Sequence, residues 1–469
     1  MNESAIHGQR AVILGASLAG LLAARVLSER YDEVVLLERD ELPDHPAPRK
    51  GTPHAVHPHG LLARGLEVLE SLFPGFTQAL VARGAVPGDL QGAVAFHVSA
   101  QRLADGIAGR PALCASRLSI EHEVRRRVAA LPGVRIVTNV DIGMPEFDAA
   151  EGRVVAARYT TRASGDEQRL ASDLTVDCTG RATHMPAWLR QWGLGAPVEE
   201  KVEIGICYVS AYFKRTGALD IGKRIDKPVV ICGATNDLPR PGVLIAQEPD
   251  EAGTPRWVMA VGGYAGDHPA PTLAGMRERV AELGSSDMKR VVEEGELMGE
   301  VIRYHLPCSV RRRYERLARF PAGLLLLGDS MTHFNPIYGQ GMTVAACEAL
   351  ALQQELARGE RGLARRYFRA AARTIDIPWQ MAVGGDLSID SVPGPRPFPL
   401  RLINAYVARV QRAAMHDAAV SLAFQRVVHM LAAPPSLFAP AVLWRVWRHG
   451  GRSAAPLRQP QAQMQRASA

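Results

Sequence analysis

Short apolar runs and helical spacing alternate over the first part of the chain. Residues 10–14 (RAVIL) and 33–38 (EVVLLE) are continuous apolar runs bounded by turn-forming residues, which is typical of buried strands. Between them, apolar positions over residues 18–30 recur at helical spacing. A strand, a helix and a second strand within about 30 residues form a βαβ unit. The pattern therefore predicts an α/β domain that begins near residue 10.

The same reading places further elements along the chain. Helical spacing predicts helices over 61–71, 117–130, 271–283 and 339–357, and mostly helical structure over 360–449. Apolar runs predict strands over 111–115, 134–138, 153–159, 174–180 and 324–329. From about 200 to 310, β-rich segments alternate with Gly and Pro turns, which indicates a second, sheet-containing domain. We expect the strand and helix after residue 320 to rejoin the first domain.

Composition narrows the class of protein. The 469 residues are 47% hydrophobic and 22% charged, as in ordinary globular proteins. No apolar run approaches the ~18 residues of a membrane span, and the first ten residues lack the apolar core of a signal peptide. The six cysteines are scattered and never form CxxC. This usage is typical of reduced thiols, so a cytoplasmic protein is expected.

The net charge of +7 is concentrated at the end of the chain. From residue 401 onwards there are nine arginines and one acid, Asp417. Such a region could meet an acidic carrier protein, a membrane surface or nucleic acid. However, only six of the 55 basic residues are lysines, so compositional bias explains much of the arginine content. No nucleic-acid-binding motif is present, and we expect no nucleic-acid partner.

The first strand–helix turn carries a dinucleotide motif. Residues 15–20 read GASLAG, a GxGxxG pattern with Ser17 at the middle glycine. Gly15 permits the tight turn, Gly20 permits close helix packing, and the helix N-terminus offers N–H groups to a pyrophosphate. Glu38 ends the second strand, 23 residues after Gly15, and is placed to bind ribose hydroxyls. The candidate cofactor-binding residues here are Gly15, Ser17, Leu18, Ala19, Gly20, Glu38 and Arg39.

A second motif favours FAD over NAD. A buried strand at 324–327 ends in Gly328 and Asp329, and NPIYGQGM at 335–342 opens a helix. Asp329 can bind a ribityl or ribose hydroxyl, and Gly339 and Gly341 permit close backbone approach to a flat ring. The helix N-terminus at Gly341 and Met342 would stabilise negative charge at the N1–C2=O edge of a reduced flavin.

These motifs resemble those of the FAD-dependent aromatic-hydroxylase superfamily, the group A flavoprotein monooxygenases. Within it, the sequence is most similar to polyether-type polyketide epoxidases. Four stretches carry the resemblance: RKGTP at 49–53 with HPH at 57–59, SR at 116–117, VDCTGR at 176–181 and GDSMTHFNPIYGQGM at 328–342. The resemblance implies an α/β fold with a split Rossmann-like FAD-binding domain, a β-rich substrate domain and a helical C-terminal region.

The resemblance also implies roles for particular residues. Arg117 would contact the FAD ribose or pyrophosphate, and the backbone near Val140 would meet the adenine. Arg49 and Lys50 would lie beside the flavin. Pro336 would border the isoalloxazine ring, and together with His57 and Asn335 it is assigned to the flavin environment. The expected domains are residues 1–199 (FAD-binding, first part), 200–310 (substrate), 311–358 (FAD-binding, second part), 359–449 (helical) and 450–469 (flexible tail).

The function implied is oxygen transfer to an apolar substrate. NAD(P)H would reduce FAD, directly or through a separate reductase. The C4a-hydroperoxyflavin formed with O₂ would then epoxidise an alkene in a dry pocket. Hydroxylation of an aromatic ring is an alternative, as is an isoprenoid reductase or cyclase without oxygen transfer. A non-catalytic FAD-binding module is a third possibility. The substrate is expected to be small and hydrophobic, of polyketide or aromatic type.

Several histidines and arginines allow more than one interpretation. His54, His57 and His59 could bind a metal, contact the flavin or form a solvated turn. No carboxylate or cysteine at ligand spacing joins them, so no metal site is expected. His333 could donate a proton or point to solvent. The arginines at 311–313 are interpreted as a solvated strand end.

Overall fold

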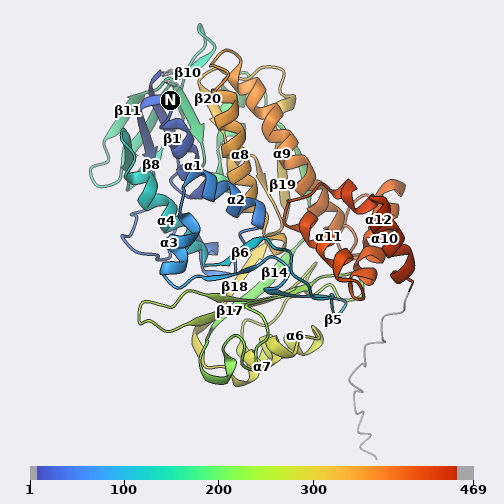
Figure 1. The fold of residues 1–469 in the computed structure, drawn as a ribbon. Coiled ribbons are helices and arrows are strands. Elements are labelled where there is room, and N and C mark those ends of the chain that lie inside the picture. The colour runs from blue at the N-terminus through green and yellow to red at the C-terminus, as the bar shows by residue number, and fades with distance from the viewer. Residues whose placement is uncertain (1–7, 452–469) are drawn as a thin grey trace, which may run out of the picture.

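The computed structural model describes residues 8–451 (Figure 1). Its first part is built on a five-stranded parallel sheet in the order β20-β12-β1-β2-β7. The strands are β1 (Gly8–Leu14), β2 (Tyr31–Leu37), β7 (Val134–Val137), β12 (Leu174–Asp177) and β20 (Leu324–Leu326). The predicted βαβ unit is therefore present, and the strand predicted after residue 320 does rejoin this sheet, at its edge beside β12.

Helices and a small sheet bury the two faces of this parallel sheet. Helices α1 (Leu18–Leu27), α4 (Arg117–Ala129) and α8 (Gly341–Leu356) pack with it into one apolar core. An antiparallel sheet covers the opposite face, where Val12, Val35 and Ala157 are fully buried. Its strands are β8 (Val140–Ile142), β9 (Glu146–Asp148), β10 (Arg153–Thr161) and β11 (Glu167–Ala171). Because both faces are covered, β1 and β2 are continuous apolar runs.

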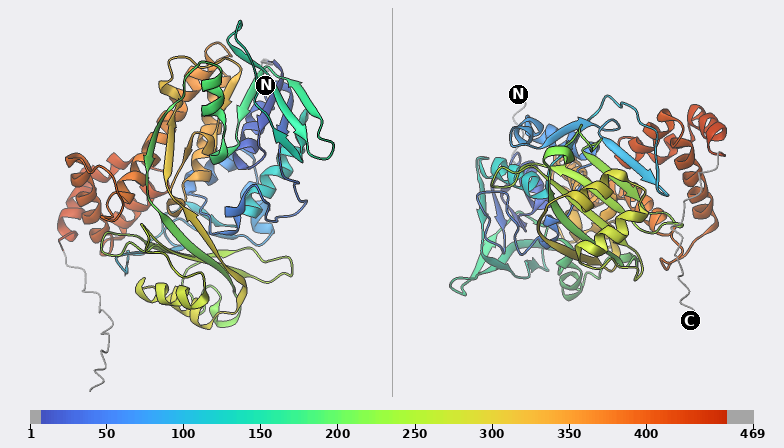
Figure 2. Two further views of the ribbon diagram at one scale, coloured as in Figure 1. Left: turned by 180° about the vertical axis from the view of Figure 1, so that it is seen from behind. Right: turned by 90° about the horizontal axis from the view of Figure 1, so that it is seen from below.

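The second part is a seven-stranded sheet in the order β18-β14-β17-β16-β15-β4-β5. Its strands are β4 (Val94–Val98), β5 (Gln101–Arg102), β14 (Ile206–Lys214), β15 (Val229–Gly233), β16 (Gly242–Gln247), β17 (Arg256–Gly263) and β18 (Leu297–Leu306). Helices α6 (Leu273–Glu282) and α7 (Ser286–Glu294) lie on its outer side (Figure 2). The sequence pattern predicted α6 but missed α7.

The predicted domain limits need one correction. Strands β4 and β5 come from the region assigned to the FAD-binding part, yet β4 pairs in parallel with β15 of the substrate sheet. Local periodicity shows that 94–98 is apolar but carries no information on which sheet it joins. The substrate sheet therefore contains two separate segments of the chain.

The arginines at 311–313 are not a solvated strand end. They lie on β19 (Ser309–Arg313), which pairs with β13 (Val198–Val202) and β21 (Thr332–His333). Arg311 is only 1% exposed, and its Nη1 lies 2.7 Å from Asp376. Arg313 pairs with Glu200 at 2.6 Å. Carboxylates from distant segments thus neutralise this charge run, and they tie β19 to its neighbours.

The C-terminal region is helical, as predicted. It contains α9 (Leu363–Asp386), α10 (Phe398–Ala414), α11 (Ala418–Val428) and α12 (Pro440–His449). Val410 and Val420 of this region pack with Val98 and Leu103, so the helices cover the β4–β5 edge of the substrate sheet. No helix within residues 8–451 is both long enough and apolar enough to cross a bilayer.

The remaining elements lie between the two sheets and around the first. They are α2 (Ala63–Leu72), α3 (Phe76–Ala82), β3 (Val86–Asp89), β6 (Pro111–Cys114) and α5 (Met185–Gln191). The predicted helix at 61–71 and strand at 111–115 are thus observed within two residues. The predicted tail at 450–469 lies almost entirely outside the described residues.

Candidate functional site

Two glycine turns meet at the carboxyl ends of the parallel strands. Gly15 follows β1 with φ +100°, and a Cβ there would lie 2.8 Å from the carbonyl oxygen of Cys178. Gly328 follows β20, and a Cβ there would lie 2.7 Å from the Cβ of Ala19. The predicted motifs, far apart in sequence, are therefore in contact. Ligands of open α/β sheets bind at such a place.

The second turn is held from both sides. The N–H of Gly328 donates to Glu348 of α8 at 2.6 Å, and burial raises the pKa of Glu348 to about 8. On the other side, the N–H of Gly180 donates to Ser330 at 2.9 Å. Asp329 lies beside Gly180, and burial raises its pKa against the opposing charges of Arg181 and Arg117. This carboxyl group is therefore partly buried at the place where a ribityl or ribose hydroxyl was expected.

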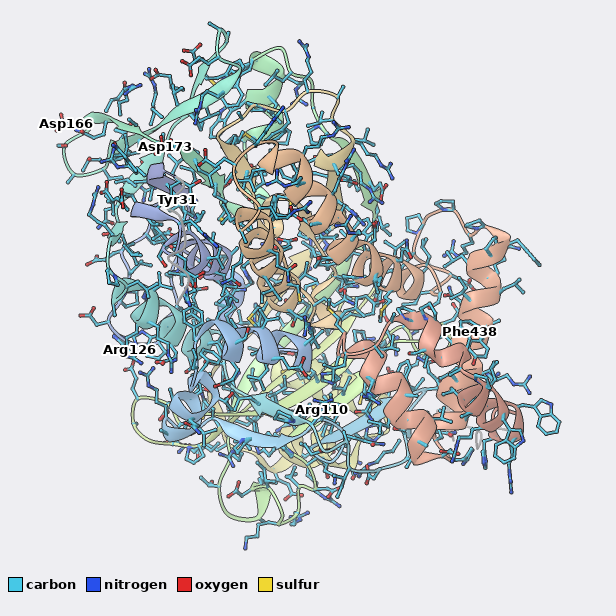
Figure 3. The ribbon with its side chains drawn as sticks, turned by 45° about the horizontal axis from the view of Figure 1, so that its top comes forward. Tyr31, Arg110, Arg126, Asp166, Asp173 and Phe438 are labelled. Atoms are coloured by element: carbon cyan, nitrogen blue, oxygen red, sulfur yellow. The ribbon has the colours of Figure 1, made fainter. Side chains whose placement is uncertain are left out.

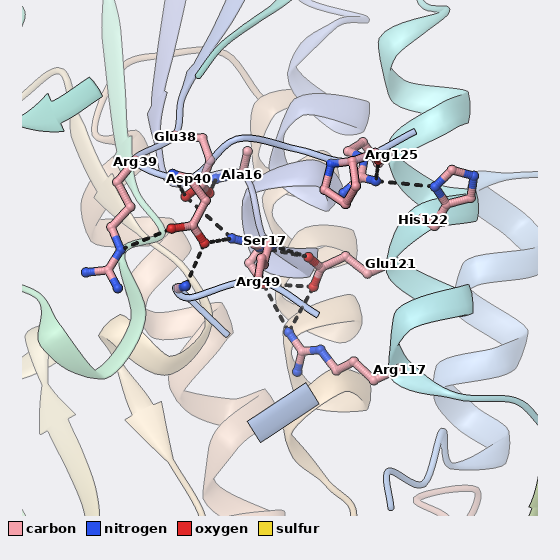
Figure 4. A network of polar contacts seen from close by, with 12 residues as sticks. Ala16, Ser17, Glu38, Arg39, Asp40, Arg49, Arg117, Glu121, His122 and Arg125 are labelled. Carbon is pink, nitrogen blue, oxygen red and sulfur yellow. Dashed lines mark hydrogen bonds and ion pairs between the residues drawn. The ribbon is translucent and has the colours of Figure 1, made fainter. Parts of the chain in front are cut away.

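Carboxylates and arginines surround the first turn (Figure 4). Glu38 follows β2 and accepts hydrogen bonds from the N–H groups of Ala16 at 2.8 Å and Asp40 at 3.1 Å. The guanidinium of Arg49 lies 3.1 Å from Asp40 and 2.8 Å from Glu121. The structure thus brings Glu38, Arg49 and the residue 15–20 turn together, although about ten residues of loop separate Arg49 from Glu38.

Glu121 is a site residue that sequence reasoning missed. It accepts hydrogen bonds from the Ser17 hydroxyl at 2.9 Å and from Arg117 at 3.1 Å. Burial alone would raise the pKa of Glu121, but Arg117 and Arg49 lower it to about 2. The available signal was its position four residues after Arg117, on the same helix face.

The arrangement fits the pyrophosphate of a dinucleotide. Arg117 reaches Ser17 at the N-terminus of α1 with its Nη2, at 3.0 Å. Its buried Nε–H has no hydrogen-bond partner. A buried unpaired donor is unfavourable unless an acceptor fills the space beside it. An anion at this helix N-terminus would supply that acceptor.

Other predicted cofactor residues differ in burial. Leu18 and Met342 are buried, and the N–H of Val140 donates to the carbonyl of Glu38 at 3.1 Å. Arg39 and Lys50 are exposed at the protein surface. Their expected contacts with FAD remain predictions.

Open space lies at the start of α8. A Cβ on Gly341 would have no neighbour within 4 Å, so the backbone there is accessible to a ligand. Gly339 has φ +64° and lies against Gly60, which ends the loop at residues 54–60 that we call the histidine loop. The 3₁₀ turn η6 (Pro336–Tyr338) precedes Gly339; Pro336 is its first residue, and Asn335 lies just before it. The backbone around residue 341 therefore leaves room for the flat ring that the sequence predicted.

The histidine loop is packed against the substrate sheet and is not a solvated turn. His57 is 2% exposed and shares a hydrogen bond of 2.8 Å with Ser210. Its ring meets Tyr208 edge-on at 5.1 Å, and burial lowers its pKa to about 4. Burial also lowers the pKa of His59 to about 3. Within residues 8–451, no group of three or more His, Cys, Asp or Glu could hold a metal ion.

His333 does not point to solvent. It is buried on β21, its Nδ1 has no hydrogen-bond partner, and burial together with Arg312 and Arg181 lowers its pKa to about 4. The sequence could not decide between an inward and an outward orientation, because β21 is only two residues long. A role for His333 in proton donation remains a prediction.

A cavity of about 1440 Å³ lies between the loop at residues 335–340, which we call the flavin-side loop, the substrate sheet and the C-terminal helices. Residues 336–340 form one wall, and Val229, Ile231, Val243 and Ile245 of the sheet form another. Helices α9, α10 and α11 supply the third, including Trp379 and Val407. The lining is mainly apolar, and it reaches the loop that was expected to border the isoalloxazine ring.

A buried polar cluster fixes that loop. Asp386 at the end of α9 is fully buried, and its Oδ1 accepts hydrogen bonds from Asn335 at 2.8 Å, Tyr264 at 3.0 Å and Tyr338 at 3.0 Å. A Cβ on Gly385 would lie 2.4 Å from the Tyr338 hydroxyl. The cluster therefore joins the substrate sheet, the flavin-side loop and the C-terminal helices. No sequence motif pointed to Asp386.

We expect Gly20→Ala to abolish FAD binding. A Cβ at position 20 would lie 2.0 Å from the carbonyl oxygen of Gly15, so α1 must move away from the turn. The FAD content of the purified variant, measured by absorbance, should fall at least about tenfold. Gly143→Ala is the control, because its Cβ would have no neighbour closer than 3.4 Å. Far-ultraviolet circular dichroism checks that both variants fold, and a folded Gly20→Ala protein with full FAD content would contradict the contact.

We expect Asp386→Asn to alter the pH dependence of stability. Burial raises the pKa of Asp386 to about 6. The folded protein therefore holds this proton more tightly than the unfolded chain, and stability falls as pH rises from about 4 to about 6. The variant lacks this titration, so its Tm relative to the wild type should increase over that range and then level off. The exposed Asp166→Asn is the control, and a pH-independent difference for Asp386→Asn would refute the titration.

Comparison with known proteins assigns this chain to a family. A family model of the FAD binding domain matches residues 9–372. Protein Rv3254 of Mycobacterium tuberculosis (strain ATCC 25618 / H37Rv) is 37% identical over 394 residues, which cover 81% of this chain and 80% of that protein.

Solved structures show the same architecture. The p-nitrophenol 4-monooxygenase PnpA from Pseudomonas putida DLL-E4 gives a TM-score of 0.61 at 14% identity, covering 91% of this chain and 99% of PnpA. PqsL, a probable FAD-dependent monooxygenase from Pseudomonas aeruginosa, gives 0.58 at 16% identity, covering 81% of this chain and 97% of PqsL. The expected split Rossmann-like fold is confirmed, and FAD is the cofactor. The chain belongs to the FAD binding domain family and has the fold of the FAD-dependent monooxygenases.

Proposed function

We propose that this flavin monooxygenase transfers one oxygen atom to a carbon–carbon double bond of a large apolar substrate. The observation that carries the proposal is the cavity of about 1440 Å³ that reaches the residue 336–340 loop. FAD, when bound and reduced by NAD(P)H directly or through a reductase, supplies the activated oxygen. One atom of O₂ enters the substrate as the epoxide, and the other leaves as water.

The walls of the cavity suit the exclusion of water. Val229, Ile231, Val243 and Ile245 line it from the substrate sheet, and α9 adds Trp379. Water near a reactive oxygen species promotes its loss as hydrogen peroxide, so a dry cavity favours transfer to the substrate. An apolar ligand with a long carbon skeleton would fill this volume and displace the remaining water.

Two tyrosine hydroxyls in the cavity are consistent with a reaction that needs no ionised side chain. Tyr208 and Tyr338 line the cavity, and burial raises the pKa of both hydroxyls. They therefore keep their protons near neutral pH. An alkene attacked by electrophilic oxygen needs no prior deprotonation, so these side chains have only to shape and orient the substrate.

Ring hydroxylation of a phenol is a second candidate, and His59 favours it. His59 lines the cavity, and its Nδ1–H donates to the carbonyl of His57 at 2.9 Å. That hydrogen bond leaves Nε2 as an acceptor. Because burial keeps the ring neutral, Nε2 would accept a hydrogen bond from the hydroxyl of a phenolic substrate and so orient its ring.

Labelled oxygen with His59→Gln separates the two reactions. The holoenzyme with NAD(P)H and a suitable reductase is given ¹⁸O₂ and either a long-chain alkene or an alkyl phenol. We expect one ¹⁸O atom in an epoxide, with turnover in His59→Gln within about threefold of the wild type. Label in a phenolic product that disappears in His59→Gln would instead favour hydroxylation. A product without label would exclude oxygen transfer and favour a reductase or cyclase.

Narrowing the cavity should restrict the substrates. Val243→Trp adds an indole to the wall formed by β16, where Val243 is partly exposed to the cavity. We expect KM to rise at least about tenfold for the largest alkenes, with little change for short ones. Ile302→Trp on the exposed side of β18 is the matched control, since Ile302 is 36% exposed and does not line this cavity. Equal KM values for Val243→Trp and the wild type would place the substrate elsewhere.

A further inference from the structure

The C-terminal helices expose an unusual number of large apolar side chains. Seven of the thirteen exposed large hydrophobic residues in the described chain lie between residues 398 and 447. Trp447 is 73% exposed, Phe398 71% and Trp444 55%. We refer to these seven as the apolar face: Phe398, Leu402, Ile403, Phe438, Leu443, Trp444 and Trp447. A patch of this kind on a globular protein marks an interaction site.

The apolar face draws its residues from α10, from the turn that contains Phe438 and from α12. Phe398 and Leu402 are one helical turn apart on α10, and Tyr406 on the next turn stacks on Phe438 at 4.4 Å. The Tyr406 hydroxyl also donates to the carbonyl of Leu437 at 2.6 Å. Figure 3 shows Phe438 on the side of the molecule formed by the C-terminal helices. On α12, Leu443 and Trp447 are four residues apart and so share one side of the helix.

Positive charge accompanies the apolar face. Residues 398–451 contain six arginines and a single acid, Asp417. Asp417 is itself buried and paired with Arg445 at 2.8 Å. The guanidinium of Arg448 lies 5.3 Å from the ring centre of Trp444, within cation–π distance. The surface therefore combines exposed indole rings with net positive charge.

The apolar face borders the cavity. Ile403 and Leu437 both line the cavity, and so do Pro399 and Leu400 of the first turn of α10. Phe398 and Leu402 of the same helix turns are exposed outside it. Apolar surface therefore continues from the outside of the protein to the wall of the cavity.

We propose that the apolar face lies on an anionic lipid bilayer, with the cavity open toward the membrane. Tryptophan and arginine together suit the interface between acyl chains and anionic headgroups. A second copy of the chain is disfavoured, because a symmetric contact would bring two positively charged regions together. An acidic protein would also pair with the arginines, but it gives no reason for apolar surface that continues into the wall of the cavity.

The consequence for the reaction rests on the proposed function. An apolar alkene is concentrated in a bilayer and scarce in water. A cavity opening at the bilayer surface would let such a substrate enter without crossing water. The binding itself does not depend on the reaction, and it can be measured without turnover.

Vesicle sedimentation of the FAD-loaded, full-length protein tests the proposal. We expect binding to vesicles of phosphatidylcholine with about 30% phosphatidylglycerol, and weak binding to phosphatidylcholine alone. Binding should fall in about 0.5 M NaCl because salt screens the arginines. Absence of binding to the anionic vesicles, or equal binding to both kinds, would overturn the proposal.

Paired substitutions locate the contact. Trp444→Ser with Trp447→Ser should reduce vesicle binding at least about tenfold while FAD content and Tm are unchanged, because both side chains are exposed. Ile107→Ser with Val198→Ser is the matched control, since these residues are 82% and 59% exposed on other parts of the surface. Wild-type binding by the tryptophan variant would overturn the proposal. So would a dimer in sedimentation velocity that becomes monomeric in this variant, because it would assign the face to a second copy.

If the wild type binds vesicles but shows no ¹⁸O incorporation, the membrane proposal stands and the proposed function fails. If the labelled epoxide forms and no vesicle binding is seen, the proposed function stands and the membrane proposal fails.

Discussion

A side chain at position 328 would collide with Ala19, and the glycine there lets the turn after β20 contact the first turn of α1. The first βα turn alone offers a helix N-terminus and a carboxylate, which many nucleotide-binding folds share. Only the second turn, carried by a strand more than 300 residues later, adds Asp329 and the open backbone at Gly341. Hydrogen bonds through Glu348 and Ser330 hold that turn in place, so its position is fixed by the sheet and α8.

Ion pairs at the residue 15–20 turn explain how an anion can bind there although three carboxylates lie close by. Glu38, Asp40 and Glu121 surround Arg49, and Glu121 also orients Arg117 toward Ser17. Carboxylates beside a pyrophosphate site would be unfavourable on their own. Here they fix two guanidinium groups that would otherwise be mobile, which lowers the entropy lost when an anion binds. The guanidinium groups at this turn and the carboxylates that position them are thus distinct sets of residues.

The sequence was sufficient wherever structure is local. The βα turn at 15–20, the strand at 324–327 and the helix that begins at Gly341 follow from periodicity and glycine placement. What it could not show depends on partners far along the chain. Arg311 looked solvated because Asp376 is distant in sequence. Asp386 has no motif because its hydrogen-bond donors lie far from it along the chain, two of them at 335 and 338 and the third at 264. The histidine loop was ambiguous for the same reason, since its burial depends on β14 and β18.

The parallel pairing of β4 with β15 also constrains how the chain reaches its native state. Val94 pairs with Val229, so the edge of β4 that faces β15 is synthesised early and has no partner until more than a hundred further residues have emerged. Pairings of such high sequence separation slow folding and leave an apolar strand edge exposed in the meantime. For the same reason, residues 200–310 expressed by themselves would carry an unpaired β15 edge, a common origin of aggregation.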